Sequence, residues 1–266
     1  MTSSPAPRMT HTHHGPAGRG VPTAPSCSLR RQEAEAVVDR VQSASLPRRL
    51  RLDAASWISA GLLYASLIAI FLQRAGFIHI ASALLDSTMV LTATVATLLS
   101  AVRRLPLQNV LLASVVIGAG GSLTGLVAVR AGIWSFPPAA GPRLLGILPW
   151  WLSCVWIVTI LASRGAALYV LGRRRPSTRF GMEVLALTTG LSLILQAGMS
   201  HFVREQGYGY SPSGGTLVTL GIGLVATVLV LCFATPILIN KKPDSFRSDF
   251  QPLIVWLPLT LLLLAT

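Results

Sequence analysis

The sequence has few charged residues, and very few of these are acidic. Only 12% of the 266 residues are charged, 52% are hydrophobic, and 22 Lys and Arg stand against 9 Asp and Glu. Soluble domains carry about 25% charged residues, so this composition argues against an ordinary soluble domain and is typical of a membrane chain. The net charge of +13 would otherwise suggest nucleic-acid binding. That function needs a soluble basic face, and we expect none here.

Cysteine and metal-ligand patterns are also scarce. The chain has three Cys: Cys27 lies in a polar N-terminal segment, whereas Cys154 and Cys232 lie in apolar stretches. We therefore predict no disulfide framework and interpret these thiols as small apolar side chains. The His, Cys, Asp and Glu residues show no spacing typical of a metal site, so we predict neither a metal nor another cofactor.

Long apolar stretches are what the sequence has in abundance. Seven of them fill the chain from about Ala54 to its end, and each is long enough to cross about 30 Å of hydrocarbon as a helix of roughly 20 residues. We therefore predict an all-α integral membrane bundle of about seven transmembrane helices over residues 51–266, with the lipid bilayer as its surroundings. The predicted spans are 54–73, 77–101, 108–129, 145–171, 182–203, 215–239 and 251–266.

Residues 1–50 form a different region, rich in Ser, Pro, Thr, Arg and His. Because this region is too polar to bury a core, we predict a disordered, basic tail. Residues 32–41 are compatible with a short surface helix. No apolar stretch precedes the first span in the way that a cleaved secretory signal would.

The distribution of Lys and Arg predicts the orientation in the membrane. Eight lie before the first span, two after the second span, four after the fourth and three after the sixth, which places seventeen on one side. Four lie on the other side, and Arg164 lies inside the fourth span. Because cytoplasmic loops retain Lys and Arg, we predict a cytoplasmic N-terminus and an external C-terminus.

The ends of the third and fifth spans share a weak repeat. Each reads as an apolar helix end followed by Arg, Gly, alternating aromatic residues and Pro, at 126–137 and 201–212. Odd-numbered spans end on the same face, so we predict that the two turns meet at the outer surface. Two interpretations remain open, an interfacial aromatic belt or a paired lid over a lipid-like substrate. The aromatic residues are Trp134, Phe136, Tyr208 and Tyr210.

Polar side chains within the spans are further candidates for function, because an ionised group in hydrocarbon is unfavourable unless it is paired or hydrated. Asp86 in the second span and Arg164 in the fourth are candidates for an interhelical ion pair. Alternatively, Arg164 would reach the inner headgroups and Asp86 would be a neutral, hydrogen-bonded structural residue. Gln196 and His201 lie in the outer half of the fifth span, where His201 would either shuttle a proton or hydrogen bond at the interface.

Small and helix-breaking residues predict packing and helix ends. Gly121 and Gly125 form a GxxxG step, which lets a neighbouring helix approach closely. Pro106 is expected to precede the third span. Pro149 and Pro236 are expected to kink the helices that contain them.

Five stretches, taken together in their order, resemble a known family. They are Leu105–Leu111, Gly141–Trp150, Ala162–Gly165, Phe233–Pro243 and Pro252–Trp256. From about residue 80 to its end, the chain resembles the membrane carotenoid biosynthesis protein family, which includes bisanhydrobacterioruberin hydratase. The resemblance implies a multi-span helical protein of a bacterial cytoplasmic membrane that acts on a long isoprenoid. In the best-known case, water is added across a terminal carbon–carbon double bond.

Such a hydration needs a proton donor beside an apolar groove and a shielded cationic carbon. The general acid would be Asp86, His201 or Glu205. The alternative is a non-catalytic membrane protein, either a binder of isoprenoid lipid or a small permease, and a permease would need a continuous polar path. The residues that we expect to contact the substrate are Trp134, Phe136, Tyr208, Tyr210, Gln196 and Arg164.

Overall fold

In the computed structural model the chain is mainly helical, which confirms the predicted all-α class. The chain divides into two units, residues 1–48 and 49–266. The structure describes residues 27–79, 82–136, 143–144, 146–172, 178–205, 211–212, 215–238 and 250–264.

The first helix, α1, begins earlier than the sequence analysis predicts. It covers Cys27–Arg74. Residues 27–50, which we expected to be disordered apart from a short helix compatible with residues 32–41, are therefore helical throughout. Gln, Glu, Ala and Arg are abundant in residues 31–40, and these residues favour a helix. The structure therefore differs from the predicted tail in this part.

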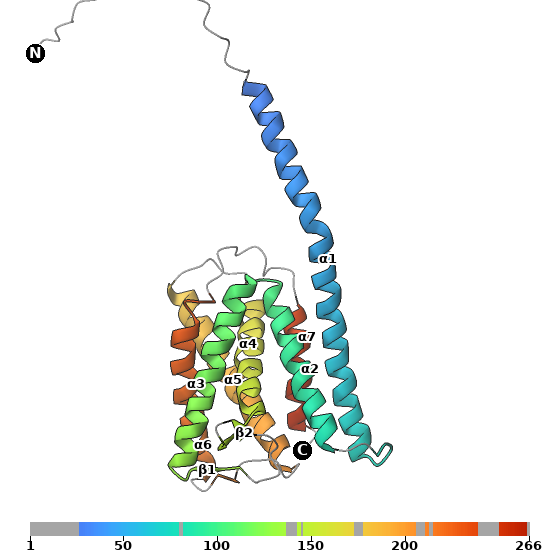
Figure 1. Ribbon diagram of the computed structural model, residues 1–266. Helices are drawn as coiled ribbons and strands as arrows, with labels where there is room; N and C mark the ends of the chain where they lie inside the picture. Colours follow the sequence, from blue (N-terminus) through green and yellow to red (C-terminus); the bar gives the residue numbers. More distant parts are fainter. Residues whose placement is uncertain are drawn as a thin grey trace, which may run out of the picture. The chain divides into compact units, whose positions relative to one another are not determined.

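Six further helices form the rest of the second unit, and Figure 1 shows α2 to α7 lying side by side. Among the described residues, four helical segments are long and apolar enough to cross a membrane: Arg51–Arg74, Leu107–Arg130, Trp151–Leu171 and Arg179–Gly198. The apolar segments Ser87–Val102, Val218–Ala234 and Gln251–Leu261 are shorter. The helices are α2 (Ser82–Val102), α3 (Leu107–Arg130), α4 (Trp151–Leu171), α5 (Thr178–Glu205), α6 (Gly215–Ala234) and α7 (Gln251–Leu264).

Helix α4 is the centre of this bundle. It packs against α2, α3, α5 and α7, and 56% of its apolar segment is buried inside the protein, against 39% for the segments of α1 and α3. An apolar helix without a polar face can be buried on several sides. The sequence of α4 fits this place, because Arg164 is its one charged residue.

Glycine residues let α3 approach α4 closely. A Cβ atom at Gly121 would lie 2.1 Å from Cγ of Trp156, and one at Gly125 would lie 2.6 Å from Cδ2 of Leu152. The predicted GxxxG contact is therefore confirmed, with α4 as the partner helix. Between these glycines, a hydrogen bond of 2.6 Å joins the hydroxyl oxygens of Ser122 and Ser153.

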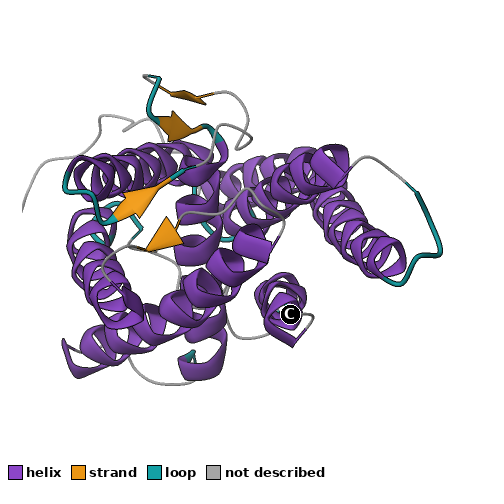
Figure 2. Cartoon of the chain, turned by 90° about the horizontal axis from the view of Figure 1, so that it is seen from below, coloured by secondary structure: helices purple, strands orange, loops and turns teal. Residues whose placement is uncertain are grey.

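Four two-residue strands accompany the helices: β1 (Trp134–Ser135), β2 (Arg143–Leu144), β3 (Leu148–Pro149) and β4 (Ser211–Pro212). They form two antiparallel pairs, β1 with β4 and β2 with β3, and Figure 2 shows them at one end of the bundle. Residues 145–150 were predicted to begin the fourth span. This prediction is wrong, because β3 and its turn at Gly146, with φ of 70°, precede the start of α4.

The three prolines that the sequence analysis singles out lie outside the interiors of helices. Pro106 occupies the N-cap position of α3, as predicted. Pro149 lies in β3, and Pro236 lies in the turn that follows α6, so the kinks expected at these two residues are wrong. Proline has no backbone N–H to donate and therefore favours the ends of helices.

Candidate functional site

The two aromatic turns predicted from the sequence repeat meet in the structure. Residue Trp134 pairs with Pro212, and Ser135 pairs with Ser211. The prediction that the turns are neighbours is therefore confirmed for residues 134–135 and 211–212. Tyr208 and Tyr210 lie outside the described residues.

A glycine cap directs the chain from α3 into this pair of turns. Gly132 has φ of 70°, a conformation that side chains other than glycine rarely adopt. The N–H of Gly132 donates to the carbonyl of Val129, and the N–H of Ile133 donates to that of Ala128. This Schellman motif ends α3 at Arg130, four residues before Trp134.

The aromatic side chains of the first turn belong to the core. Trp134 and Phe136 are 7% and 9% exposed, and the ring of Phe136 packs edge-on against Trp151 with a centroid distance of 6.0 Å. An interfacial belt would leave these rings largely exposed, so that interpretation is wrong for Trp134 and Phe136. Their packing holds the turn against the start of α4.

Beside this turn, an apolar groove runs between α3 and α6. Its volume is about 610 Å³, which lies within the range of about 300–1,000 Å³ typical of small-molecule sites. We call it the α3–α6 groove. Its walls include Thr124, Val127 and Ile133 on one side and Gly221, Val225 and Leu229 on the other.

The predicted proton donors lie at the same end of the bundle as the two turns. His201 and Glu205 belong to the last turns of α5. Asp86 is the fifth residue of α2 and therefore lies near the beginning of the helix. The structure describes the backbone of all three residues but not their side chains. Chain direction alone therefore brings them to one end. Among the described residues, no group of three or more His, Cys, Asp and Glu is arranged to hold a metal ion.

Gln196 connects two helices. Its Nε2 atom donates to Oγ1 of Thr227 in α6 at 3.0 Å, and Thr227 is fully buried. A Cβ atom at Gly223 would lie 3.1 Å from Oε1 of Gln196, so the glycine makes room for the amide. Gln196 therefore forms part of the contact between α5 and α6.

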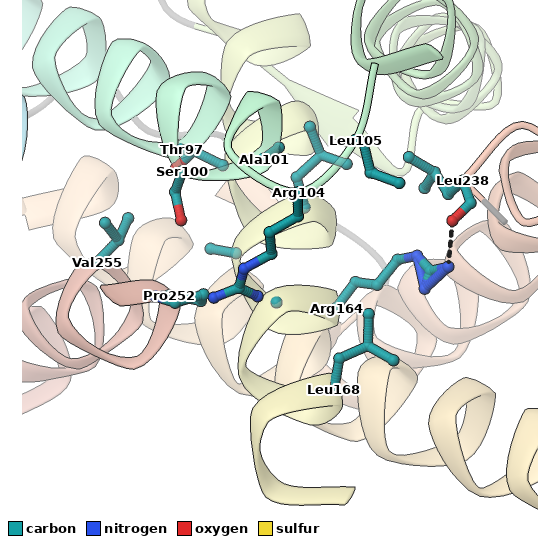
Figure 3. A pocket seen from close by; sticks show the side chains of 13 residues that line it. Thr97, Ser100, Ala101, Arg104, Leu105, Arg164, Leu168, Leu238, Pro252 and Val255 are labelled. Atoms are coloured by element: carbon teal, nitrogen blue, oxygen red, sulfur yellow. Dashed lines mark hydrogen bonds between the residues drawn. The ribbon is translucent and has the colours of Figure 1, made fainter. Parts of the chain in front are cut away.

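Arg164 lies at the other end of the bundle. Its Nη2 atom donates to the carbonyl of Leu238 at 2.8 Å (Figure 3), and it lines a pocket that also includes Thr97 of α2. Asp86 precedes Thr97 by eleven residues, which is about 16 Å along a helix. The predicted ion pair between Arg164 and Asp86 is therefore wrong.

A polar cluster at this end joins α1, the α2–α3 turn and α7. Arg103 donates from Nε to Oδ1 of Asp53 and from Nη1 to Oε1 of Gln251, both at 2.8 Å. Gln251, which is fully buried, donates from Nε2 to Oγ of Ser56. The sequence analysis missed this cluster, because it counted Arg103 only as a topology signal and did not single out Asp53 or Gln251.

The α3–α6 groove was also missed. The available signal was weak: Gly221 leaves one position of α6 without a side chain. Which helix lies opposite that position depends on tertiary packing, and no periodicity reveals it.

A comparison of the chain with protein-family models, curated proteins and solved structures finds no match.

Proposed function

We propose that this chain is a seven-span protein of the bacterial cytoplasmic membrane that binds a long isoprenoid, such as a carotenoid, in the α3–α6 groove. The observation that carries the proposal is the groove itself, with a volume of about 610 Å³ between two apolar helices. The resemblance of five stretches to carotenoid biosynthesis proteins gives the class of ligand. Asp86, His201 and Glu205 are the proposed proton donors if the bound isoprenoid is hydrated.

The lining of the groove favours an apolar chain over a polar permeant. Val127, Val225 and Leu229 line it and are more than half exposed. Exposed apolar side chains of this extent are unfavourable in water but are ordinary where hydrocarbon surrounds the protein. A ligand dissolved in the bilayer would reach the groove directly from the side.

The position of the groove agrees with the proposed chemistry. Its walls come from the second half of α3, the turn that follows α3, and the first and middle turns of α6. Helix α5 ends with His201 and Glu205 shortly before α6 begins, so these candidate donors lie at the end of the bundle toward which the groove runs. A terminal double bond of a bound isoprenoid would then lie at this end of the bundle.

We expect substitutions at Gly221 to block this groove without disturbing the core. Gly221 lines the groove, and a Cβ atom at this residue would have no other atom within 4 Å. Gly221→Phe should therefore fill the groove and weaken binding of a linear carotenoid by at least about tenfold, which corresponds to 1.4 kcal/mol. Quenching of tryptophan fluorescence during carotenoid titration of the detergent-purified protein measures this affinity.

Gly190→Phe is the matched control. Gly190 is an exposed residue of α5 that also has open space around its Cβ position, and it does not line the groove. We expect this variant to keep the affinity of the unmodified protein. Equal affinities for all three proteins would contradict the groove as the isoprenoid site.

The proposed orientation predicts which loops face the cytoplasm. With a cytoplasmic N-terminus, loops 103–107, 172–181 and 240–249 are cytoplasmic, because these loops and the segment before the first span contain seventeen of the 22 Lys and Arg. In a variant without the three native cysteines, an impermeant thiol reagent added to intact cells should label Ser211→Cys and not Ser177→Cys. The reverse labelling pattern would show the opposite orientation.

A further inference from the structure

The pocket that contains Arg164 lies at the end of the bundle opposite the two aromatic turns. Residues from the end of α2, the second half of α4, the turn after α6 and the beginning of α7 line it. Its cavity measures about 30 Å³, which is enough for one water-sized group. The pocket is therefore separate from the α3–α6 groove.

Two guanidinium groups flank this cavity. Figure 3 shows that the Arg104 side chain reaches toward Pro252, whereas Arg164 reaches toward Leu238. Arg104 is only 9% exposed. No carboxylate belongs to the described residues that line the pocket, so both lining charges are positive. We call this site the two-arginine pocket.

Hydrogen-bond donors remain available in the two-arginine pocket. The hydrogen bond that the structure gives Arg164 goes to the neutral carbonyl of Leu238, and its Nε atom is buried without a partner among the described residues. The hydroxyl of Thr97 is likewise buried without a partner there. Ser100, which is 5% exposed, adds a second hydroxyl to the lining.

The buried positive charge of Arg164 favours a negatively charged ligand in this pocket. A buried cation is strongly unfavourable unless an opposite charge and hydrogen bonds compensate it. Arginine binds phosphate oxygens through charge-assisted hydrogen bonds, and basic pockets between transmembrane helices bind the headgroups of anionic lipids. A cavity of about 30 Å³ has room for one phosphate oxygen, with the rest of the group outside it.

We propose that the two-arginine pocket binds a phosphate group, with one oxygen held in the cavity by Arg164, Arg104 and the hydroxyl of Thr97. The phosphate is supplied either by the headgroup of an anionic lipid or by free inorganic phosphate. With the N-terminus in the cytoplasm, as proposed above, the pocket faces the inner leaflet. Binding itself does not depend on that orientation or on the isoprenoid groove.

Thermal unfolding of the full chain in a neutral detergent tests this proposal, because a ligand that binds the folded state raises its Tm. The probes are short-chain phosphatidylglycerol, short-chain phosphatidylcholine and inorganic phosphate. We expect phosphatidylglycerol to raise the Tm in a saturable way. We expect Arg164→Gln to weaken this binding by about tenfold or more, the effect of losing a charge-assisted hydrogen bond.

Arg179→Gln is the matched control. Arg179 lies at the beginning of α5 at the same end of the bundle, has a side chain that is 91% exposed, and does not line the pocket. We expect its affinity for phosphatidylglycerol to stay within about twofold of that of the unmodified protein, since exposed charges contribute little. An equal loss in both arginine variants would indicate general charge attraction and would overturn the site.

The three probes identify the source of the phosphate. Saturable stabilisation by phosphatidylglycerol alone indicates a lipid headgroup, and an additional effect of inorganic phosphate that Arg164→Gln removes indicates that the free anion also binds. Stabilisation by neither probe would overturn the proposal. An equal effect of phosphatidylcholine would do so as well, because it would indicate contact with lipid chains and not with the anionic headgroup.

Thr97→Val provides a second variant in case Arg164→Gln does not fold. This change removes the partnerless buried hydroxyl, so the ligand-free protein should be at least as stable as the unmodified one. Its affinity for phosphatidylglycerol should nevertheless fall several-fold. An unchanged affinity in Thr97→Val would count against the hydroxyl as a ligand and against the site as proposed.

Discussion

We expect Gly121→Ala to destabilise the bundle more than any other addition of a single methyl group between α3 and α4. The added Cβ atom would lie 2.1 Å from Cγ of Trp156, 2.4 Å from Cδ1 and 2.5 Å from Cδ2. The indole is buried in the core and cannot turn away as a flexible side chain would. The two helices must therefore separate.

Overpacking of a core lowers the free energy of unfolding by about 1–3 kcal/mol, and sometimes by more. For a chain of this size that change lowers the Tm by several degrees or more. Thermal unfolding of the purified protein in detergent measures the loss. Gly190→Ala is the control, because nothing lies within 4 Å of its Cβ position, and it should leave the Tm nearly unchanged.

A second substitution distinguishes this clash from a general effect of alanine. Trp156→Leu removes the ring that the new methyl group meets. In the unmodified protein this substitution should lower the Tm, whereas in the Gly121→Ala protein it should recover part of the Tm that Gly121→Ala loses. This non-additivity is expected for residues in contact. A Gly121→Ala protein with the Tm of the Gly190→Ala control would show that α3 and α4 do not pack at this distance.

Gln251→Leu should produce the second large loss of stability. The fully buried amide accepts a hydrogen bond from Arg103 and donates one to Ser56, so it joins the beginning of α7 to α1 and to the α2–α3 turn. Leucine has a similar volume but leaves both partners without this contact. Removing one partner from buried polar groups lowers the free energy of unfolding by about 1–3 kcal/mol, and thermal unfolding measures the change.

Gln251→Glu is the informative control for this cluster. A carboxylate at this position still accepts from the guanidinium of Arg103 and also accepts from the hydroxyl of Ser56, so both partners keep a hydrogen bond. We expect this variant to be more stable than Gln251→Leu. A Gln251→Leu protein as stable as the unmodified chain would show that hydrophobic packing, and not the polar cluster, holds α7 in place.

The features that the sequence alone determined are those that depend on one segment at a time. Each of the seven predicted apolar stretches overlaps a helix of the described residues, and four of these helices contain a segment long and apolar enough to cross a membrane, because a helix satisfies its own backbone hydrogen bonds whatever its neighbours are. Pro106 placed the start of α3, and Gly121 with Gly125 identified the face of α3 that another helix contacts. The aromatic turns were correctly predicted to meet at residues 134–135 and 211–212, because chain direction decides at which end of the bundle a span finishes.

Only the tertiary structure decided the features that depend on which helices are neighbours. Arg164 contacts Leu238 and not Asp86, because the end of α2 that lies beside it is the one with Thr97 and Ser100. Trp134 and Phe136 turn into the core, and the α3–α6 groove exists because the packing of the bundle places Val127 of α3 and Gly221 of α6 on its two walls. Hydropathy locates the apolar part of a helix, whereas the rotation of each helix about its axis, and with it the partner of every polar side chain, depends on how neighbouring side chains interlock.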